Sequence, residues 1–577
     1  MSFSMLSFDR DLYRLVALAA ASLAIVLSLA LPAAAEPGDV EIGIQHVIAA
    51  TVCDKLSSTL AVSVCRDLRT AYTSRVFRPV WVGNDDATAR LEALARALQD
   101  GRRHALPGDS EWVAGLLESA SELSGVASPD VVPGVLAAID VAASQAFLRA
   151  ARERARGRLD PAVADPQWFI PRPAYNAVAA LEEAAISGDV GGVLDRQVPT
   201  SHGYSILLEA LEASQREGDD TFDPIPAGGT LRSGSHNRRV VWLRARLRVE
   251  AAAGEASLFD ENLEAAVKTF QQAHGLNPDG VVGGHTLASL NAPPYWRRAQ
   301  LAANLERLRW LGGQPQGRYI LVDVAEARLR LFEDDALVLE MRIAVGTDEN
   351  QTPSFQGRMT YLVFRPFWNI PESIAGEEIV PNVLADPDYL ASHEIDLLPG
   401  WKSDAEVEAV DPASVQWSDL DPEHLPFRMR QRPGRLNPLG NVKFMFPNSF
   451  NIYLHDTSNR GIFARDGRNL SHGCVRIQKP VSLATYLLRR NEEWNVAKIE
   501  EAMSAEATSE IGLPEPIPVY LVYRTVFADS QGRIVYRNDP YERDAPLATA
   551  LGYLAPAENP ALEEPSERGL DQVSSSR

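Results

Sequence analysis

A short run late in the chain carries the residues best suited to chemistry. It reads Ser-His-Gly-Cys-Val-Arg from Ser471 to Arg476, and its Cys474 has no obvious partner. His455 lies nineteen positions upstream of this cysteine. A thiol is a useful nucleophile only as a thiolate, and a nearby imidazole is the usual means of removing its proton. Cys474 and His455 together therefore predict acyl transfer through a thioester.

Neighbouring residues supply other parts that acyl transfer needs. Gly473 lets the backbone approach a substrate closely, and N–H groups around Gly473 and Cys474 could receive a developing oxyanion. Arg476 could favour the thiolate and hold a carboxylate, or it could pair with a structural carboxylate. We expect no metal, because zinc binding by His455, His472 and Cys474 would lack a second cysteine or a spaced fourth ligand. A plain turn with a buried thiol is the remaining alternative.

Size and charge limit the class of protein. At 577 residues the chain is too long for one core, and its length suggests three or four domains. The net charge of −21 argues against nucleic acid as a partner, because neutralising phosphates requires clustered Lys and Arg.

The first 35 residues have the pattern of a signal peptide. Arg10 and Arg14 precede an apolar run from Leu15 to Leu31, and Ala33–Ala35 provide a small-residue cleavage pattern. The alternative is an uncleaved anchor in the inner membrane. Both place the rest of the protein outside the cytoplasm, and we expect a periplasmic location. No second apolar stretch looks long enough to cross a bilayer.

Two further cysteines fit an oxidising compartment. Cys53 and Cys65 lie twelve positions apart and could pair there, although spacing alone does not decide it. Cys474 is then the odd cysteine, which is a liability in an exported protein unless it does chemistry.

The spacing of apolar residues changes from helical to strand-like along the chain, which predicts a multidomain α+β protein. Residues 36–235 have helical periodicity and predict a helical scaffold that ends in a linker, Asp223–Ser235. Residues 236–296 predict a small three-helix module. The scaffold also contains a group of aromatic residues and a proline that we interpret as core: Tyr72, Phe77, Pro79 and Trp81.

Beyond about residue 300 the pattern is that of strands. Residues 300–545 predict a β-rich catalytic domain. An irregular, acidic and Pro-rich stretch at about 375–432 interrupts the strands and could be a lid or binding loop. The tail, 546–577, is rich in Pro, Glu and Ser, and we expect it to be disordered.

The small module carries a recognisable motif. Residues 270–286 read Phe-Gln-x-x-His-Gly-Leu-x-x-Asp-Gly-x-x-Gly-x-x-Thr, after an apolar helix face that includes Leu263 and Val267. This module resembles the type 1 peptidoglycan-binding domain. The matched residues are also those that form apolar faces, turns and caps, and we expect His274 and His285 to be capping or surface residues.

The catalytic run has a resemblance of its own. Residues 453–457, Tyr-Leu-His-Asp-Thr, followed by Ser471–Arg476, resemble the YkuD-type L,D-transpeptidase catalytic domain. The order of parts is similar to that of its large periplasmic, YcbB-like subgroup. The resemblance implies that Cys474 is the nucleophile, that His455 is its base, and that the third member after His455 contributes a backbone carbonyl. It also implies an oxyanion site at His472 and Gly473, and contacts with the donor peptide from Tyr453, Ser471, Arg476 and Trp368.

The resemblance implies a function in the cell wall. Cys474 would attack a tetrapeptide stem at its third residue, release D-alanine, and pass the acyl group to the side-chain amine of another stem, which forms a 3→3 cross-link. No cofactor is needed, carbapenems would acylate the thiol, and the partners are peptidoglycan stem peptides and glycan. The sequence does not reveal protein partners such as envelope synthesis proteins. Water or a protein lysine as acceptor, and a non-catalytic wall-binding scaffold, remain as alternatives.

Overall fold

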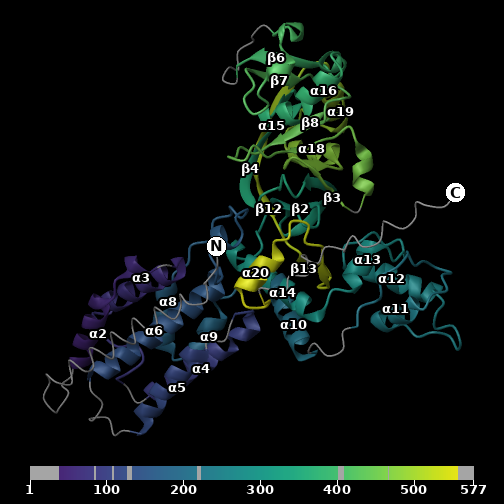
Figure 1. The fold of residues 1–577 in the computed structure, drawn as a ribbon. Coiled ribbons are helices and arrows are strands. Elements are labelled where there is room, and N and C mark those ends of the chain that lie inside the picture. The colour runs from purple at the N-terminus through teal and green to yellow at the C-terminus, as the bar shows by residue number, and fades with distance from the viewer. Residues whose placement is uncertain are drawn as a thin grey trace. The chain divides into compact units, whose positions relative to one another are not determined.

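The structure, a computed structural model, describes residues 38–555 except 57, 84–85, 107–109, 126–132, 218–222, 401–408 and 466. The predicted signal peptide, 1–35, and the end of the predicted tail, 556–577, lie outside the described residues. The chain divides into two compact units, one formed by the chain up to Gln314 and again from Arg524, the other by Pro315–Tyr523. Figure 1 shows the elements of both.

The first unit begins with the predicted helical scaffold. Its helices lie around α6 (Pro133–Arg156), most of which is buried (Figure 1). The α6 helix is long and apolar enough to cross a membrane, but 78% of its most apolar window is buried inside the unit, which is the setting of a core helix. The other helices are α2 (Asp39–Ala50), α3 (Thr59–Ser74), α4 (Ala87–Gln99), α5 (Ser110–Gly125), α7 (Pro161–Ala164), α8 (Ala177–Ser187), α9 (Val190–Asp195) and α10 (His202–Glu217).

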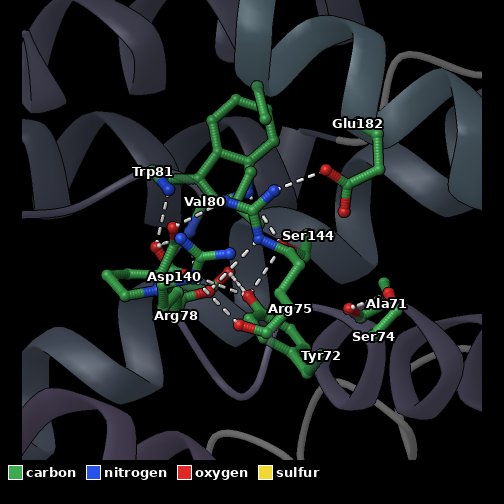
Figure 2. Close-up of polar contacts among 12 residues, drawn as sticks. Ala71, Tyr72, Ser74, Arg75, Arg78, Val80, Trp81, Asp140, Ser144 and Glu182 are labelled. Atoms are coloured by element: carbon green, nitrogen blue, oxygen red, sulfur yellow. Dashed lines mark hydrogen bonds and ion pairs between the residues drawn. The ribbon is translucent and has the colours of Figure 1, made fainter.

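The aromatic group of the scaffold packs in the core, as predicted, and it surrounds a buried carboxylate. Asp140 of α6 is fully buried and accepts hydrogen bonds from the backbone N–H groups of Val80, Trp81 and Val82 at 2.6–3.0 Å. The Tyr72 hydroxyl donates to the same carboxylate at 2.5 Å (Figure 2). One acidic side chain thus fixes the turn that follows α3.

The structure pairs the two N-terminal cysteines. Cys53 and Cys65 form a disulfide with a Cα–Cα distance of 5.5 Å, which ties the short segment before α3 to the helix itself. Cys474 is the free cysteine among the described residues.

The small module has the three predicted helices, α11 (Arg239–Leu247), α12 (Glu261–Ala273) and α13 (Gly284–Leu290). Asp260 caps α12 by accepting from the N–H of Leu263 at 2.9 Å. The predicted linker is more than a linker, because Ile225 and Leu231 are buried in the core of this module. The sequence predicted a linker because the stretch is rich in Pro and Gly, but its apolar side chains pack into the module.

The predicted boundaries of the catalytic domain, 300 and 545, are too wide. Helix α14 (Pro294–Leu311) belongs to the first unit, together with β13 (Val526–Ala528), β14 (Ile534–Tyr536) and α20 (Asp544–Ala550). A buried ion pair joins Arg307 of α14 to Asp544 of α20 at 2.5 Å. The predicted disordered tail is therefore ordered at its start, where Leu547, Leu551 and Leu554 are buried.

The second unit is built on a nine-stranded sheet with the order β10-β3-β11-β9-β8-β4-β12-β1-β2. Strand β2 also pairs with β3, so the sheet closes on itself and leaves few free edges. The strands are β1 (Tyr319–Asp323), β2 (Arg328–Glu333), β3 (Ala336–Gly346), β4 (Phe355–Phe364), β8 (Val442–Met445), β9 (Leu454–His455), β10 (Asn469–Ser471), β11 (Val475–Ile477) and β12 (Ser509–Val522). Two helices, α18 (Pro480–Leu488) and α19 (Val496–Ser504), follow β11.

The insertion predicted at about 375–432 is not irregular, and it begins earlier. A three-stranded sheet of β5 (Trp368–Ile370), β7 (Phe427–Gln431) and β6 (Ile395–Pro399) packs with short helices around its own apolar cluster. The helices are α15 (Glu372–Ile374), the π-helical turn Ala375–Ile379, α16 (Val380–Ala385) and α17 (Tyr389–Ser392). The sequence pattern did not reveal this subdomain, because its strands are short and lie among Asp, Glu and Pro residues.

Candidate active site

Two neighbouring parallel strands bring the predicted nucleophile and base to one region. In β9 and β11, Leu454 pairs with Val475 and His455 with Arg476. Since side chains alternate along a strand and paired residues share a face, Cys474, Arg476 and His455 lie on the same face of the sheet. The loop that carries Cys474 thus leads into a strand that lies next to the strand of His455, although the two residues are nineteen positions apart in the sequence.

A main-chain carbonyl orients the imidazole of His455. Its Nδ1 lies 2.6 Å from the carbonyl oxygen of Asp456. Because a carbonyl oxygen only accepts, Nδ1 carries the hydrogen in this contact, and the lone pair of the neutral ring is on Nε2. The backbone of Leu439 is a second hydrogen-bond partner of the imidazole. The Asp456 carboxylate has other partners, the backbone N–H groups of Asn441 and Thr457 and the guanidinium of Arg460. The backbone carbonyl of Asp456, and not its carboxylate, is therefore the group that contacts the imidazole.

The electrostatics of the site hold both groups neutral at rest. Burial, and then Arg476 and Lys443, lower the pKa of His455 to about 3. Burial raises the pKa of the Cys474 thiol, against the opposing effects of Tyr453, Lys443 and Arg476. The thiol donates a weak hydrogen bond to the carbonyl of Asn451 at 3.6 Å. At rest, residue 474 is therefore a thiol and residue 455 a neutral imidazole.

Lys443 is a residue of this site that sequence reasoning did not assign. It lies on β8, opposite His455 in the β8–β9 pair, and its Nζ stands 4.3 Å from the centre of the Tyr453 ring. Burial lowers its pKa. The signal that could have found it is a lysine within an otherwise apolar strand next to the histidine strand.

The turn that presents Cys474 is held by hydrogen bonds from a different loop. Gly473 has φ of 100°, a conformation that favours glycine. The buried hydroxyl of Thr352 donates to the Gly473 carbonyl at 2.8 Å and accepts from the N–H of Gly346 at 2.9 Å. Sequence reasoning missed Thr352, whose contact with the turn spans 121 residues.

Two predicted substrate contacts have other surroundings in the structure. Ser471 is buried and its hydroxyl donates to the Cys474 carbonyl at 2.6 Å, so it shapes the turn from within. Trp368 lies in β5 and packs against the apolar cluster of the insertion, and no described contact joins it to Cys474. A serine in a tight turn and an aromatic residue in a short segment between two prolines are ambiguous signals in a sequence.

The other predicted site residues line the region around the thiol. Tyr453 directly precedes β9, and its ring lies 5.8 Å from that of His455. Arg476 is partly buried, and its Nε makes no hydrogen bond within the described part of the chain. His472 is half exposed and its Nε2 lies 2.8 Å from Glu378 of the insertion. Among the described residues no group of three or more His, Cys, Asp or Glu could hold a metal ion.

Comparison with known proteins identifies the class of each part. Residues 317–498 match the family described as "L,D-transpeptidase catalytic domain" (YkuD), residues 66–211 match "Scaffold domain", and residues 237–290 match "Putative peptidoglycan binding domain". The chain therefore carries an L,D-transpeptidase catalytic domain of the YkuD family, together with a peptidoglycan-binding type 1 domain. Both resemblances seen in the sequence are confirmed, as is the predicted order of a helical region, a small binding domain and a β-rich domain.

A relative and a solved structure were also found. A protein of Haemophilus influenzae named "Putative L,D-transpeptidase" is 36% identical over 251 residues, which are 44% of this chain and 49% of that protein. The chain thus spans about half the length of this curated relative. A crystal structure of an L,D-transpeptidase from Xylanimonas cellulosilytica is 16% identical and covers 52% of this chain and all of its own, with a TM-score of 0.15.

Proposed function

We propose that this protein is a peptidoglycan L,D-transpeptidase that works through a thioester on Cys474. The observation that carries the proposal is that Cys474 directly precedes β11, whose neighbour β9 carries His455, and that Nδ1 of His455 is hydrogen-bonded to a carbonyl. The match of residues 317–498 to the L,D-transpeptidase catalytic domain supports it, and the matched binding domain supports peptidoglycan as the substrate.

The first half of the reaction acylates the enzyme. Cys474 gives its proton to Nε2 of His455 as its sulfur attacks the carbonyl of the third residue of a tetrapeptide stem. The oxyanion is met by N–H groups around Gly473 and Cys474. As the peptide bond breaks, His455 returns the proton to the departing amine, and D-alanine leaves. Arg476, with an unpaired buried Nε, is suited to hold a carboxylate of the donor.

The second half transfers the acyl group. The side-chain amine of another stem attacks the thioester, His455 takes the proton of the amine, and the sulfur leaves and is reprotonated. The product is a 3→3 cross-link. The same two groups and the same oxyanion site serve both halves, and no step requires a cofactor. This reaction would take place in the periplasm, and carbapenems would acylate the same thiol.

The test is the mass of the protein after exposure to substrate. We expect incubation with tetrapeptide muropeptides to add one tripeptide-bearing fragment to Cys474, to release D-alanine, and to yield cross-linked dimers. Cys474→Ala should form neither adduct nor dimer. A wild-type protein without any adduct on Cys474 would refute the proposal, and free tripeptide without dimer would show that water is the acceptor instead.

A further inference from the structure

The insertion contributes a carboxylate next to the catalytic turn. Glu378, in the π-helical turn Ala375–Ile379, places Oε1 at 2.8 Å from Nε2 of His472. His472 is two residues before the nucleophile. The two side chains are 45% and 50% exposed, so the pair is open to solvent and to a substrate. Within the described part of the chain, the other carboxylate oxygen of Glu378 makes no hydrogen bond.

Two cations act on the thiol and on His455. Arg476 and Lys443 both act on His455 and both lower its pKa, and both also act on the thiol. These cations suit a donor carboxylate but would repel the ammonium form of an acceptor amine. The opposite charge enters this site from the insertion, through Glu378.

We infer that Glu378 binds the ammonium group of the acceptor stem before that group loses its proton and attacks the thioester. This inference rests on the proposed function. The pair with His472 holds the carboxylate at the turn, while its second oxygen is available for a charge-assisted hydrogen bond. A contact between two exposed polar side chains is weak, so an arriving ammonium can share the carboxylate at little cost. The donor side of the site is cationic, and the acceptor side is anionic.

The experiment separates the two halves of the reaction in the full chain. Cys474 is first acylated with a tetrapeptide donor, and its deacylation is then followed by mass against rising concentrations of an acceptor muropeptide. We expect Glu378→Gln to raise the acceptor concentration needed for half-maximal transfer by about tenfold, with the acylation rate unchanged. Hydroxylamine, an uncharged nucleophile at neutral pH, should deacylate wild type and variant equally.

A matched control lies one residue away. Glu377 is exposed and in the same turn, so Glu377→Gln makes the same change in charge, and we expect it to behave as wild type. Glu378→Asp should recover part of the acceptor binding. If Glu378→Gln slows acylation and transfer together, or leaves the acceptor dependence unchanged, the inference is wrong. These outcomes differ from a failure of the proposed function, in which wild-type Cys474 would form no adduct.

Discussion

At the scale of single residues, the site depends on how a main-chain atom fixes the tautomer of His455. The Asp456 carbonyl accepts from Nδ1, while its buried carboxylate holds two N–H groups and Arg460. The carboxylate therefore holds the chain around His455, and we expect it not to act as the acid of a triad. A sequence that reads His-Asp suggests the opposite, so a substitution can decide.

We expect Asp456→Asn to lower stability more than chemistry. The asparagine keeps the carbonyl that orients His455 but leaves one buried N–H group without an acceptor, at a cost of about 1–3 kcal/mol. Acylation of Cys474 should slow by less than about tenfold, whereas His455→Gln should slow it by about a hundredfold or more. Thermal unfolding and adduct kinetics of both variants measure this. If Asp456→Asn slowed acylation as much as His455→Gln does, the Asp456 carboxylate would take part in the chemistry.

We expect His455 to stay neutral well below pH 6. Its pKa in the folded protein is lowered to about 3, against about 6.5 in an unfolded chain. Between these two pKa values the unfolded chain binds a proton at His455 and the folded protein does not. The free energy of unfolding is therefore greatest above about pH 6.5 and falls as pH drops toward 3, by at most about 1.4 kcal/mol per pH unit. NMR titration of labelled histidine should show no change of His455 between pH 5 and 8.

Arg476→Gln tests the cause of that shift. It removes one of the cations that lower the pKa of His455, so the His455 titration should move upward. The same cation lowers the pKa of the thiol, so alkylation of Cys474 by iodoacetamide should need a higher pH than in wild type. A His455 titration unaffected by this substitution would mean that burial and Lys443 account for the shift without Arg476.

At the scale of elements, the catalytic turn is supported by the segment between β3 and β4. Thr352 spans Gly473 and Gly346 by two buried hydrogen bonds, and the N–H of Thr347 donates to the Ser471 carbonyl at 2.9 Å. The position of the nucleophile therefore depends on a loop that makes no contact with substrate in the proposed mechanism.

We expect Thr352→Val to disturb this support without changing the volume of the side chain. It removes the buried hydrogen bonds that the Thr352 hydroxyl makes with the Gly473 carbonyl and the Gly346 N–H, at about 1–3 kcal/mol each. The melting temperature should fall and acylation of Cys474 should slow. Thr347→Val is the control, since the hydroxyl of Thr347 accepts only an exposed hydrogen bond from Asn350. Equal behaviour of the two variants would argue against a special role for Thr352.

At the scale of the whole molecule, the two units have separate cores. The helical unit contains the buried carboxylate of Asp140 (Figure 2), and the catalytic unit closes around its own sheet. The chain returns to the helical unit after the catalytic unit, through β13, β14 and α20. Stability of the scaffold and chemistry of the site should therefore respond to different substitutions.

We expect Asp140→Asn to destabilise the helical unit selectively. An amide offers one accepting oxygen, so at least one of the N–H groups of Val80, Trp81 and Val82 loses its partner, at about 1–3 kcal/mol for each. Thermal unfolding should begin at lower temperature, while folded protein should acylate Cys474 as fast as wild type. Asp189→Asn is the control, because Asp189 is an exposed N-cap and asparagine caps equally well. Slower acylation in folded Asp140→Asn would contradict the separation.

The sequence by itself determined the order of the parts and predicted the chemistry that we propose. The spacing of His455 and Cys474, the glycine before the nucleophile, and the helical and strand periods were enough, because these signals are local. Only the tertiary structure decided the boundaries, the disulfide between Cys53 and Cys65, the core of the insertion, and the supporting roles of Thr352, Lys443 and Glu378. Those features depend on contacts between residues far apart in the chain, such as Thr352 with Gly473, and the residue pattern of one segment carries no information about which distant segment will pack against it.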